Sequence, residues 1–174
     1  MIGGLNTYAY VHSNPIGHKD YFGLRDIVID PAFEQAFERV LRTPTGRQLV
    51  DEILQQRDDF PLTIKINRDC DSWNRRDEGI EINPNYNPWM LTESGFQTPS
   101  LSSIVAHELA HSATTAPALW FPNGVSESEI VRQTNYWEMV YIVEPWENPI
   151  REELGEPARV VYQSIAPANC ECQK

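Results

Sequence analysis

The sequence predicts an α+β domain in which several helices and a small sheet share one core. Apolar residues first recur every three or four positions, as on the buried face of a helix, and then alternate in short runs bounded by proline, as in a strand. The chain has 174 residues, of which 41% are hydrophobic and 22% are charged. This length and composition are typical of a single globular domain.

Two amphipathic helices are expected at the start of the folded part. Asp30 can cap a helix that begins at Pro31, and Thr43 with Pro44 repeats this signal, because the fixed φ of proline suits the first helical position. The residues expected on the buried faces are Phe33, Phe37, Val40 and Leu41 in the first helix, and Leu49, Val50, Ile53 and Leu54 in the second.

Two strands are expected to follow these helices. In LTIKI, residues 62–66, every second residue is apolar, which predicts a strand with one buried face. The apolar positions are Leu62, Ile64 and Ile66, with Ile80 and Ile82 in the second strand. Pro84 should end the second strand and, because proline cannot donate a ladder hydrogen bond, place it at the edge of the sheet. Residues 83–95 are rich in asparagine and proline and are expected to form a loop.

A helix is expected over SLSSIVAHELAHSA, which contains the pattern HExxH. Thr98 as cap and Pro99 as first helical residue mark its start. His107 and His111 lie four residues apart, about 40° around the helix axis, so both rings can face one metal ion. Glu108 points about 100° away from His107 and can take a proton from a water that zinc has made more acidic. The pattern predicts a zinc-dependent hydrolase with two histidine ligands and Glu108 as general base.

Chance alone would rarely produce this pattern. With four histidines in 174 residues, HExxH would arise with a probability on the order of one per cent. The alternative interpretation is a core helix with two incidental histidines. The other two histidines, His12 and His18, both lie before residue 25. Every later histidine therefore belongs to the motif, which favours the zinc interpretation.

The third zinc ligand is expected to be a carboxylate. A catalytic zinc normally has three protein ligands and leaves the fourth position to water. No histidine follows His111, and position 114 is threonine rather than glycine, so the extended pattern HExxHxxGxxH is excluded. The candidates after the motif are Glu127, Glu129, Glu138, Glu144 and Glu147.

Glu138 has surroundings that suit a ligand. A helix from residue 126 to about residue 143 would place it on a rigid element. Trp137 and Val140 lie close to it in sequence and indicate a partly buried stripe. An unpaired carboxylate would be costly there without a cation such as zinc.

Glu144 and Glu147 remain alternatives. Glu144 precedes Pro145, where the helix should end. Glu147 precedes a short helix that Gly155 closes. Both carboxylates could instead form salt bridges or caps near Arg151.

Charge and cysteine content exclude several functions. The formal net charge is -11, from 25 acidic and 14 basic residues, which disfavours nucleic acid and anionic lipid as partners, because both attract clustered lysine and arginine. No apolar run approaches the ~20 residues that cross a bilayer, and no signal peptide is recognised. The three cysteines, too few for a disulfide framework, are Cys70, Cys170 and Cys172. The last two belong to residues 169–174, which are expected to be an inert tail.

Residues 1–24 differ in character from the rest, with glycine, asparagine and tyrosine crowded into GGLNTYAYVHSNPIGHKDYFGL. This segment resembles the end of the core shell of Rhs-repeat proteins, which carry a variable toxin at their C-terminal tip. The family segment ends in a pattern close to DPxGL, which corresponds to DYFGL here, with Tyr21 in place of proline. The resemblance implies that the shell cuts itself after Leu24, so that Arg25 begins a toxin domain over residues 25–168. The alternative is an ordinary tyrosine-rich hairpin.

The toxin domain resembles the NleD-type effector metalloproteases over about residues 78–160. The shared features are the stretch NPNYNP, the motif HELAHS, a glutamate in a following helix and the close ENPIREELGEPAR. The resemblance implies a zincin-like metalloprotease fold with an HExxH active-site helix, a small sheet and a second helix that carries a ligand. Alignment with this family favours Glu138 as the third zinc ligand over Glu144 and Glu147.

Both resemblances imply a toxin that a specialised secretion system or an Rhs shell delivers into the cytosol of a target cell. There it would hydrolyse peptide bonds of a specific protein. The expected partners are that substrate, the Rhs shell before release and, if the target is bacterial, an immunity protein. The alternative is a zinc-containing binding module that sequesters its target. A structural zinc usually has four ligands rich in cysteine and histidine, and only two histidines lie near one another here. A nuclease is disfavoured by the negative charge.

Overall fold

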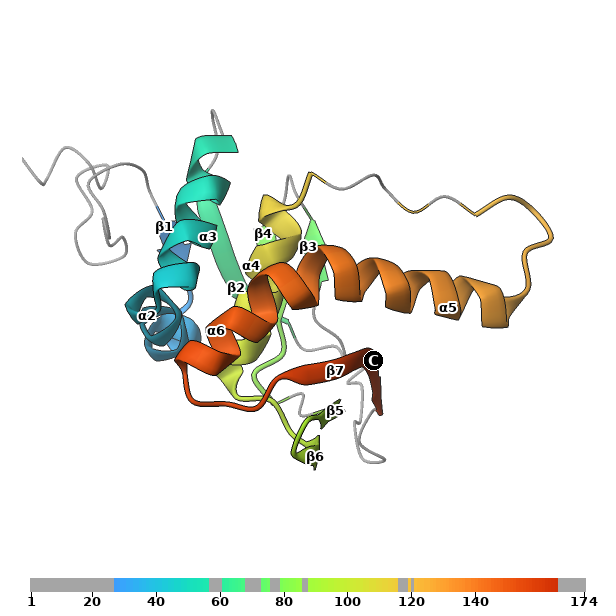
Figure 1. Cartoon of the computed structure of the whole chain (residues 1–174). Coiled ribbons are helices and arrows are strands. Elements are labelled where there is room, and N and C mark those ends of the chain that lie inside the picture. The colour runs from blue at the N-terminus through green and yellow to red at the C-terminus, as the bar shows by residue number, and fades with distance from the viewer. Residues whose placement is uncertain are drawn as a thin grey trace, which may run out of the picture.

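The chain forms a mixed α+β domain, as predicted (Figure 1). The structure is a computed structural model that describes residues 27–56, 61–67, 73–75, 79–85, 88–115, 119 and 121–165. The Rhs-like segment of residues 1–24, the tail of residues 169–174 and the three cysteines lie outside this described part.

A four-stranded sheet contributes to the core. Its strands, in their order across the sheet, are β1 (Ile27–Ile29), β2 (Leu62–Ile66), β4 (Gly79–Ile82) and β3 (Trp73–Arg75). The first three strands are parallel, and β3 is antiparallel to β4. The prediction that the strand with Ile80 and Ile82 lies at the edge is wrong. Pro84 lies beyond the last residue of β4, so it removes no ladder hydrogen bond, and β3 pairs with the second edge of β4.

Helices connect β1 to β2. They are the short 3-10 helix η1 (Pro31–Phe33), α2 (Glu34–Arg42) and α3 (Pro44–Gln56). The Asp30 carboxylate accepts a hydrogen bond from the Ala32 amide at 3.0 Å, and the Thr43 hydroxyl accepts one from the Gly46 amide at 3.0 Å. Both predicted caps are therefore confirmed, because each side chain satisfies an amide of the first turn that has no partner within the helix.

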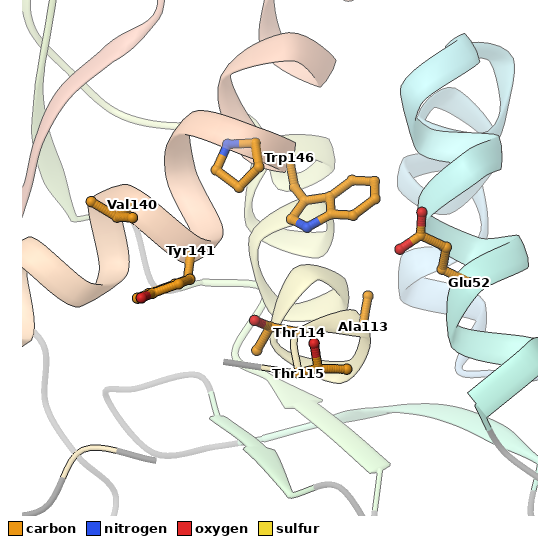
Figure 2. A pocket seen from close by; sticks show the side chains of 8 residues that line it. Glu52, Ala113, Thr114, Thr115, Val140, Tyr141 and Trp146 are labelled. Atoms are coloured by element: carbon orange, nitrogen blue, oxygen red, sulfur yellow. The ribbon is translucent and has the colours of Figure 1, made fainter. Parts of the chain in front are cut away.

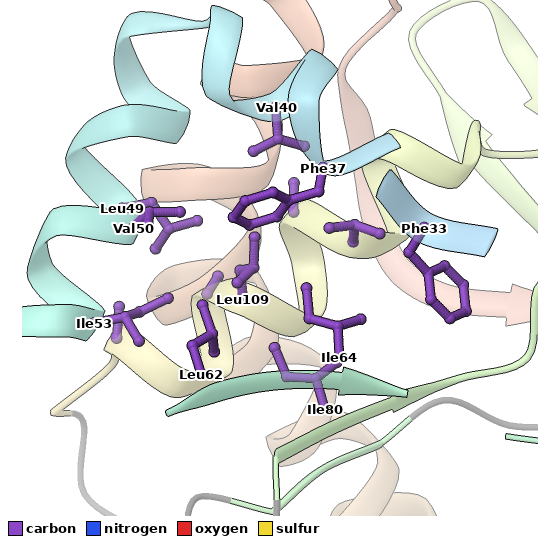
Figure 3. Close-up of a cluster of buried hydrophobic side chains, with 14 of the residues drawn as sticks. Phe33, Phe37, Val40, Leu49, Val50, Ile53, Leu62, Ile64, Ile80 and Leu109 are labelled. Atoms are coloured by element: carbon purple, nitrogen blue, oxygen red, sulfur yellow. The ribbon is translucent and has the colours of Figure 1, made fainter. Parts of the chain in front are cut away.

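The predicted buried faces meet in one core, together with α4 (Leu101–Ala113). Figure 3 shows side chains from α2, α3 and α4 directed at the sheet. The fully buried members include Phe33, Phe37, Val40, Leu49, Val50, Ile53, Leu62, Ile64, Ile80, Val105 and Leu109. Burial of each such side chain contributes about 1.5–3 kcal/mol. Ile66 was expected on the same face but is 44% exposed, because it is the last residue of β2 and lies outside this cluster.

A second, three-stranded sheet was not predicted. Its order is β6 (Gly95–Gln97), β5 (Trp89–Thr92) and β7 (Arg159–Ile165), and both pairings are antiparallel. The expectation of a loop over residues 83–95 is therefore wrong for its second half. Asparagine and proline mark the turn at Asn83, where the side chain accepts a hydrogen bond from the Asn85 amide at 2.9 Å. Gly95, with a φ of 96°, begins β6 in the hairpin with β5.

The HExxH helix begins two residues later than predicted. Ser100, rather than Thr98, is the cap, and its hydroxyl accepts a hydrogen bond from the Ser103 amide at 3.1 Å. Pro99 consequently lies before the cap and not in the first turn. The helix itself, with the motif in its second half, is as predicted.

The C-terminal helix is longer than predicted. It runs from α5 (Glu127–Glu138) through a π-helical segment, η2 (Met139–Glu147), into α6 (Asn148–Glu153) without a break. The prediction that it ends before Pro145 is wrong. A proline interrupts the hydrogen bonds of an α-helix, but here the chain widens into π turns around it. In the described part of the chain, no helix combines the length and the apolar character that a membrane span requires.

Candidate metal centre

The HExxH helix brings its two histidines together. His107 and His111 lie one turn apart on α4, and their Nε2 atoms are 3.3 Å apart. The two ring planes meet at 82°. His107 is buried, whereas the side chain of His111 remains 23% exposed. Two imidazole nitrogens at this separation can bind one ion.

The π-helical segment turns two carboxylates toward these histidines. Glu138 ends α5 and Glu147 ends η2, nine residues later. In an α-helix nine residues make about two and a half turns, so the two side chains would point in opposite directions. A helix with i→i+5 hydrogen bonds has roughly 4.5 residues per turn, so nine residues make about two turns. Both carboxylates consequently lie on one side and reach His107.

Glu138 completes a three-residue group that could hold a metal ion. Its Oε2 lies 3.5 Å from His111 Nε2 and 3.9 Å from His107 Nε2. This oxygen is buried and has no hydrogen-bond partner in the described part of the chain. A buried carboxylate oxygen without a partner is costly, and a cation between it and the imidazoles would remove that cost. The three side chains therefore fit a metal ion.

The pKa values of two group members reflect their burial. Burial raises the pKa of Glu138 to about 7, although the positive charges of His107 and Arg159 act in the opposite direction. Burial and the charge of His107 together lower the pKa of His111 to about 3, although the charge of Glu147 acts in the opposite direction. A bound cation would favour the deprotonated carboxylate and the neutral imidazole, which are the forms that bind metals.

Glu147 contacts the other nitrogen of His107. Its Oε2 lies 2.8 Å from His107 Nδ1 and 3.2 Å from Arg159 Nη1, and its Oε1 lies 3.8 Å from Arg151 Nη1. The contact with Arg151 was foreseen as an alternative role for this glutamate. Metal-binding histidines commonly donate their second ring N–H to a carboxylate, which fixes the tautomer. Glu147 in this place keeps a proton on Nδ1 and leaves the Nε2 lone pair for a metal.

The contact between His107 and Glu147 shifts the pKa values of both side chains toward their charged forms. Burial raises the pKa of Glu147, but the hydrogen bond from His107 and the charges of His107, Arg159 and Arg151 outweigh it, so that the pKa falls to about 2. Burial lowers the pKa of His107, but the hydrogen bond and charge of Glu147, with the charge of Glu108, raise it overall. Glu147 is therefore a charged acceptor, which strengthens its hold on the imidazole.

The other candidate carboxylates lie elsewhere. Glu127 and Glu144 are exposed, and Glu129 forms an ion pair with Arg132 at 2.6 Å. Among the described residues, Glu138 is the carboxylate that lies close enough to both histidines to bind the same metal ion.

Glu108, the second residue of the motif, also lies at this centre. It follows His107 on α4, is 6% exposed, and its negative charge contributes to the raised pKa of His107. Its buried carboxylate therefore lies close enough to His107 to act on the pKa of that imidazole.

Two aromatic rings flank the imidazoles. Tyr162 stacks on His107 with centroids 5.6 Å apart, and Trp137 stacks on His111 with centroids 6.1 Å apart. Trp137 lies one position before Glu138, so α5 supplies both a candidate ligand and a ring that covers the neighbouring histidine. The rings restrict the rotation of the imidazoles.

Sequence reasoning missed the contribution of β7. Asn148 accepts a hydrogen bond from the Arg159 amide at 2.7 Å and donates one to the Arg159 carbonyl at 2.9 Å, which ties the strand to α6. The register of β7 against β5 then shifts, because Thr92 pairs with Arg159 whereas Met90 pairs with Ser164. The four residues 160–163 of β7 consequently lie opposite the single residue Leu91 of β5. This irregularity brings Tyr162 to His107. Arg159 was recognisable as part of the ENPIREELGEPAR close, whereas Tyr162 carries no local signal.

The donor set at this centre consists of two imidazole nitrogens and one carboxylate oxygen. Such nitrogen and oxygen donors suit divalent first-row transition metals. No protein family, curated protein or solved structure matches the chain.

Proposed function

We propose that this chain is a zinc-dependent peptidase that acts as a toxin on a protein of its target cell. The observation that carries the proposal is the convergence of His107 Nε2, His111 Nε2 and Glu138 Oε2, with the ligand atoms of the three residues within 4.8 Å of one another. Two histidines and one glutamate are a ligand set of hydrolytic zinc sites. The proposed zincin-like fold rests on this set and on the HExxH helix.

A catalytic zinc is favoured over a structural one. Structural zinc sites are closed by four protein ligands, mostly cysteine and histidine. In the described residues the group has three members, and the 23% exposure of the His111 side chain leaves a side open for substrate. A binding module with a structural zinc is therefore the weaker interpretation.

Each residue of the centre has a separate role in the proposed hydrolysis of a peptide bond. When bound, zinc would polarise the scissile carbonyl and lower the pKa of water toward ~7. Glu108 would accept a proton from the attacking water and pass it to the amine that leaves as the peptide bond breaks. Glu147 keeps the proton on His107 Nδ1, so that Nε2 stays directed at the ion. Trp137 and Tyr162 limit the access of solvent to the imidazoles.

The delivery route is proposed from the sequence resemblances. An Rhs-like segment ahead of the domain supports release from a shell after Leu24, and the NleD-like features support a protein substrate in the cytosol of the target cell. A bacterial target would require an immunity protein in the producing cell. The formal net charge of -11 disfavours nucleic acid as the substrate.

Profiling of protein N-termini tests the proposal. Cells that express the wild-type chain are compared with cells that express Glu108→Ala, and Glu144→Ala is the matched control because it removes an exposed carboxylate of η2. We expect discrete new N-termini with the wild type and with Glu144→Ala. Glu108→Ala should yield none, although it should still bind one zinc ion per chain in elemental analysis. New termini that persist in the Glu108→Ala cells would remove the hydrolytic proposal.

A further inference from the structure

An open pocket lies between α3, the end of α4 and η2 (Figure 2). Its volume is about 490 Å³, within the range of roughly 300–1,000 Å³ that is common for ligand sites. Glu52 lines it from α3, residues 113–115 line it from the end of α4, and Tyr141 and Trp146 line it from η2. The proposed chemistry uses none of these residues.

The charge of the pocket is negative. Glu52 is the charged residue that lines it, and no lysine or arginine does so within the described part of the chain. Gln48 donates a hydrogen bond to Glu52 Oε1 at 3.0 Å, which leaves the second carboxylate oxygen, Oε2, to face a ligand. Ala113 is the last residue of α4, so the pocket also meets the C-terminal end of a helix, where the peptide dipoles favour a cation.

Two aromatic rings complete a site for a cation. Figure 2 shows the Glu52 carboxylate directed from α3 toward the indole of Trp146, with Tyr141 on the neighbouring turn of η2. The faces of indole and phenol rings attract ammonium and guanidinium groups. Thr114 and Thr115 add hydroxyl oxygens that can accept hydrogen bonds from such groups.

The pocket adjoins the candidate metal centre. Tyr141 lies with its centroid 5.7 Å from that of Trp137, which stacks on His111. Ala113 lies two residues after His111 on the same helix. One wall of the pocket is thus separated from a candidate ligand by a single ring, so a peptide bound at the centre could place a nearby side chain in the pocket.

We propose that this pocket binds a lysine or arginine side chain of the protein substrate and selects for a basic residue near the cleaved bond. The proposal rests on the peptidase function argued above. Its basis is the meeting of a carboxylate, a helix C-terminus and two aromatic rings in one cavity, whose Tyr141 wall packs against Trp137, the ring that stacks on His111. The net charge of -11 would further favour a basic stretch of substrate.

Direct binding tests the pocket without catalysis. Nα-acetyl-arginine amide and Nα-acetyl-norleucine amide are titrated into the full-length protein, with and without zinc. The indole N–H resonance of Trp146, assigned with Trp146→Phe, is the readout. The variant is Glu52→Gln, and the matched control is Asp51→Asn, which removes the same charge one residue away and outside the pocket.

We expect the arginine compound to shift the Trp146 resonance and the norleucine compound to leave it unchanged. Affinity for the arginine compound should fall about tenfold in Glu52→Gln, which loses a charge-assisted hydrogen bond. It should fall less than about twofold in Asp51→Asn, because Asp51 does not line the pocket and its charge acts there only at longer range. Equal binding of both compounds, or unchanged affinity in Glu52→Gln, would overturn the proposal.

Cleavage sites separate this proposal from the peptidase proposal. New N-termini that depend on Glu108 but show no nearby lysine or arginine would overturn the pocket proposal and leave the peptidase function standing. Binding of the arginine compound without any Glu108-dependent N-terminus would overturn the peptidase function and leave the pocket as a site for a basic group. If both proposals hold, Glu52→Gln should retain zinc and lose the preference for basic residues.

Discussion

His107 Nδ1 and Glu147 Oε2 lie 2.8 Å apart in the interior of the domain. The side chain of Glu147 is 1% exposed, and Arg159 lies against the same oxygen at 3.2 Å. A histidine held in this way has one defined tautomer and one defined ring orientation. We therefore expect Glu147 to be a positioning residue, which would act on a bound metal through His107 and not by direct contact.

Glu147→Gln tests this positioning role. Glutamine keeps an acceptor for His107 Nδ1 but removes the charge, so we expect the affinity for zinc to fall by about 10–100-fold while one zinc ion per chain still binds. Competition with a chromophoric chelator measures the affinity. Glu144→Gln is the control, because it makes the same change at an exposed position of η2. Unchanged zinc affinity in Glu147→Gln would show that the contact has only a structural role.

The sequence was sufficient for the features that local signals encode. Asp30 and Thr43 cap their helices, and His107 with His111 lie one turn apart, because caps and helical periodicity involve neighbours in the chain. The sequence favours Glu138 as the ligand but leaves Glu144 and Glu147 open, and the contact of Glu147 with His107 could not be predicted. That contact depends on the π turns between Glu138 and Glu147, and sequence periodicity assumes 3.6 residues per turn.

The strands show the same limit. β7 pairs with β5, which lies more than 60 residues earlier in the chain, and its register shift breaks the alternation that marks a strand. The interior place of β4 depends on its pairing with β3. Pairing between segments as far apart as β5 and β7 leaves no signal in either segment alone.

Gly46→Ala should destabilise the domain although alanine favours helices. A Cβ at this position of α3 would lie 2.2 Å from the Val40 carbonyl oxygen and 2.5 Å from the Thr43 hydroxyl. Alanine would gain about 1 kcal/mol of helix propensity, but α3 would have to move away from α2. We expect a net loss of about 1–3 kcal/mol in the free energy of unfolding, measured by urea denaturation. Gln48→Ala, on the exposed side of α3, should change it by less than about 0.5 kcal/mol.

Zinc should stabilise the folded chain through His107 and His111. A ligand that binds the folded state at about 100 times its Kd adds about 2.7 kcal/mol to the free energy of unfolding. We expect thermal denaturation to show this increase for the wild type and its loss after addition of a chelator. His111→Ala should bind zinc poorly and show no increase, because two protein ligands rarely hold the ion tightly. A wild-type chain that neither binds zinc nor gains stability would contradict the metal assignment.

Glu138→Gln should stabilise the metal-free protein and weaken its binding of zinc. Burial raises the pKa of Glu138 from 4.5 to about 7. The folded state therefore binds a proton more tightly than the unfolded state. Below pH 4.5 the carboxylate does not lower the free energy of unfolding. Between pH 4.5 and pH 7 it lowers this free energy by a growing amount, and above pH 7 by a constant amount. This constant amount is on the order of 3 kcal/mol.

Urea denaturation of the metal-free wild type and Glu138→Gln at pH 4 and pH 8 measures the difference. The two proteins should have similar stability at pH 4, and the variant should be the more stable at pH 8 by up to this amount, since glutamine carries no charge to bury. With saturating zinc the order at pH 8 should reverse, because the wild type alone offers a carboxylate ligand. If the variant were less stable than the wild type at pH 8 without metal, or bound zinc equally well, Glu138 would be an ordinary ion-pair residue.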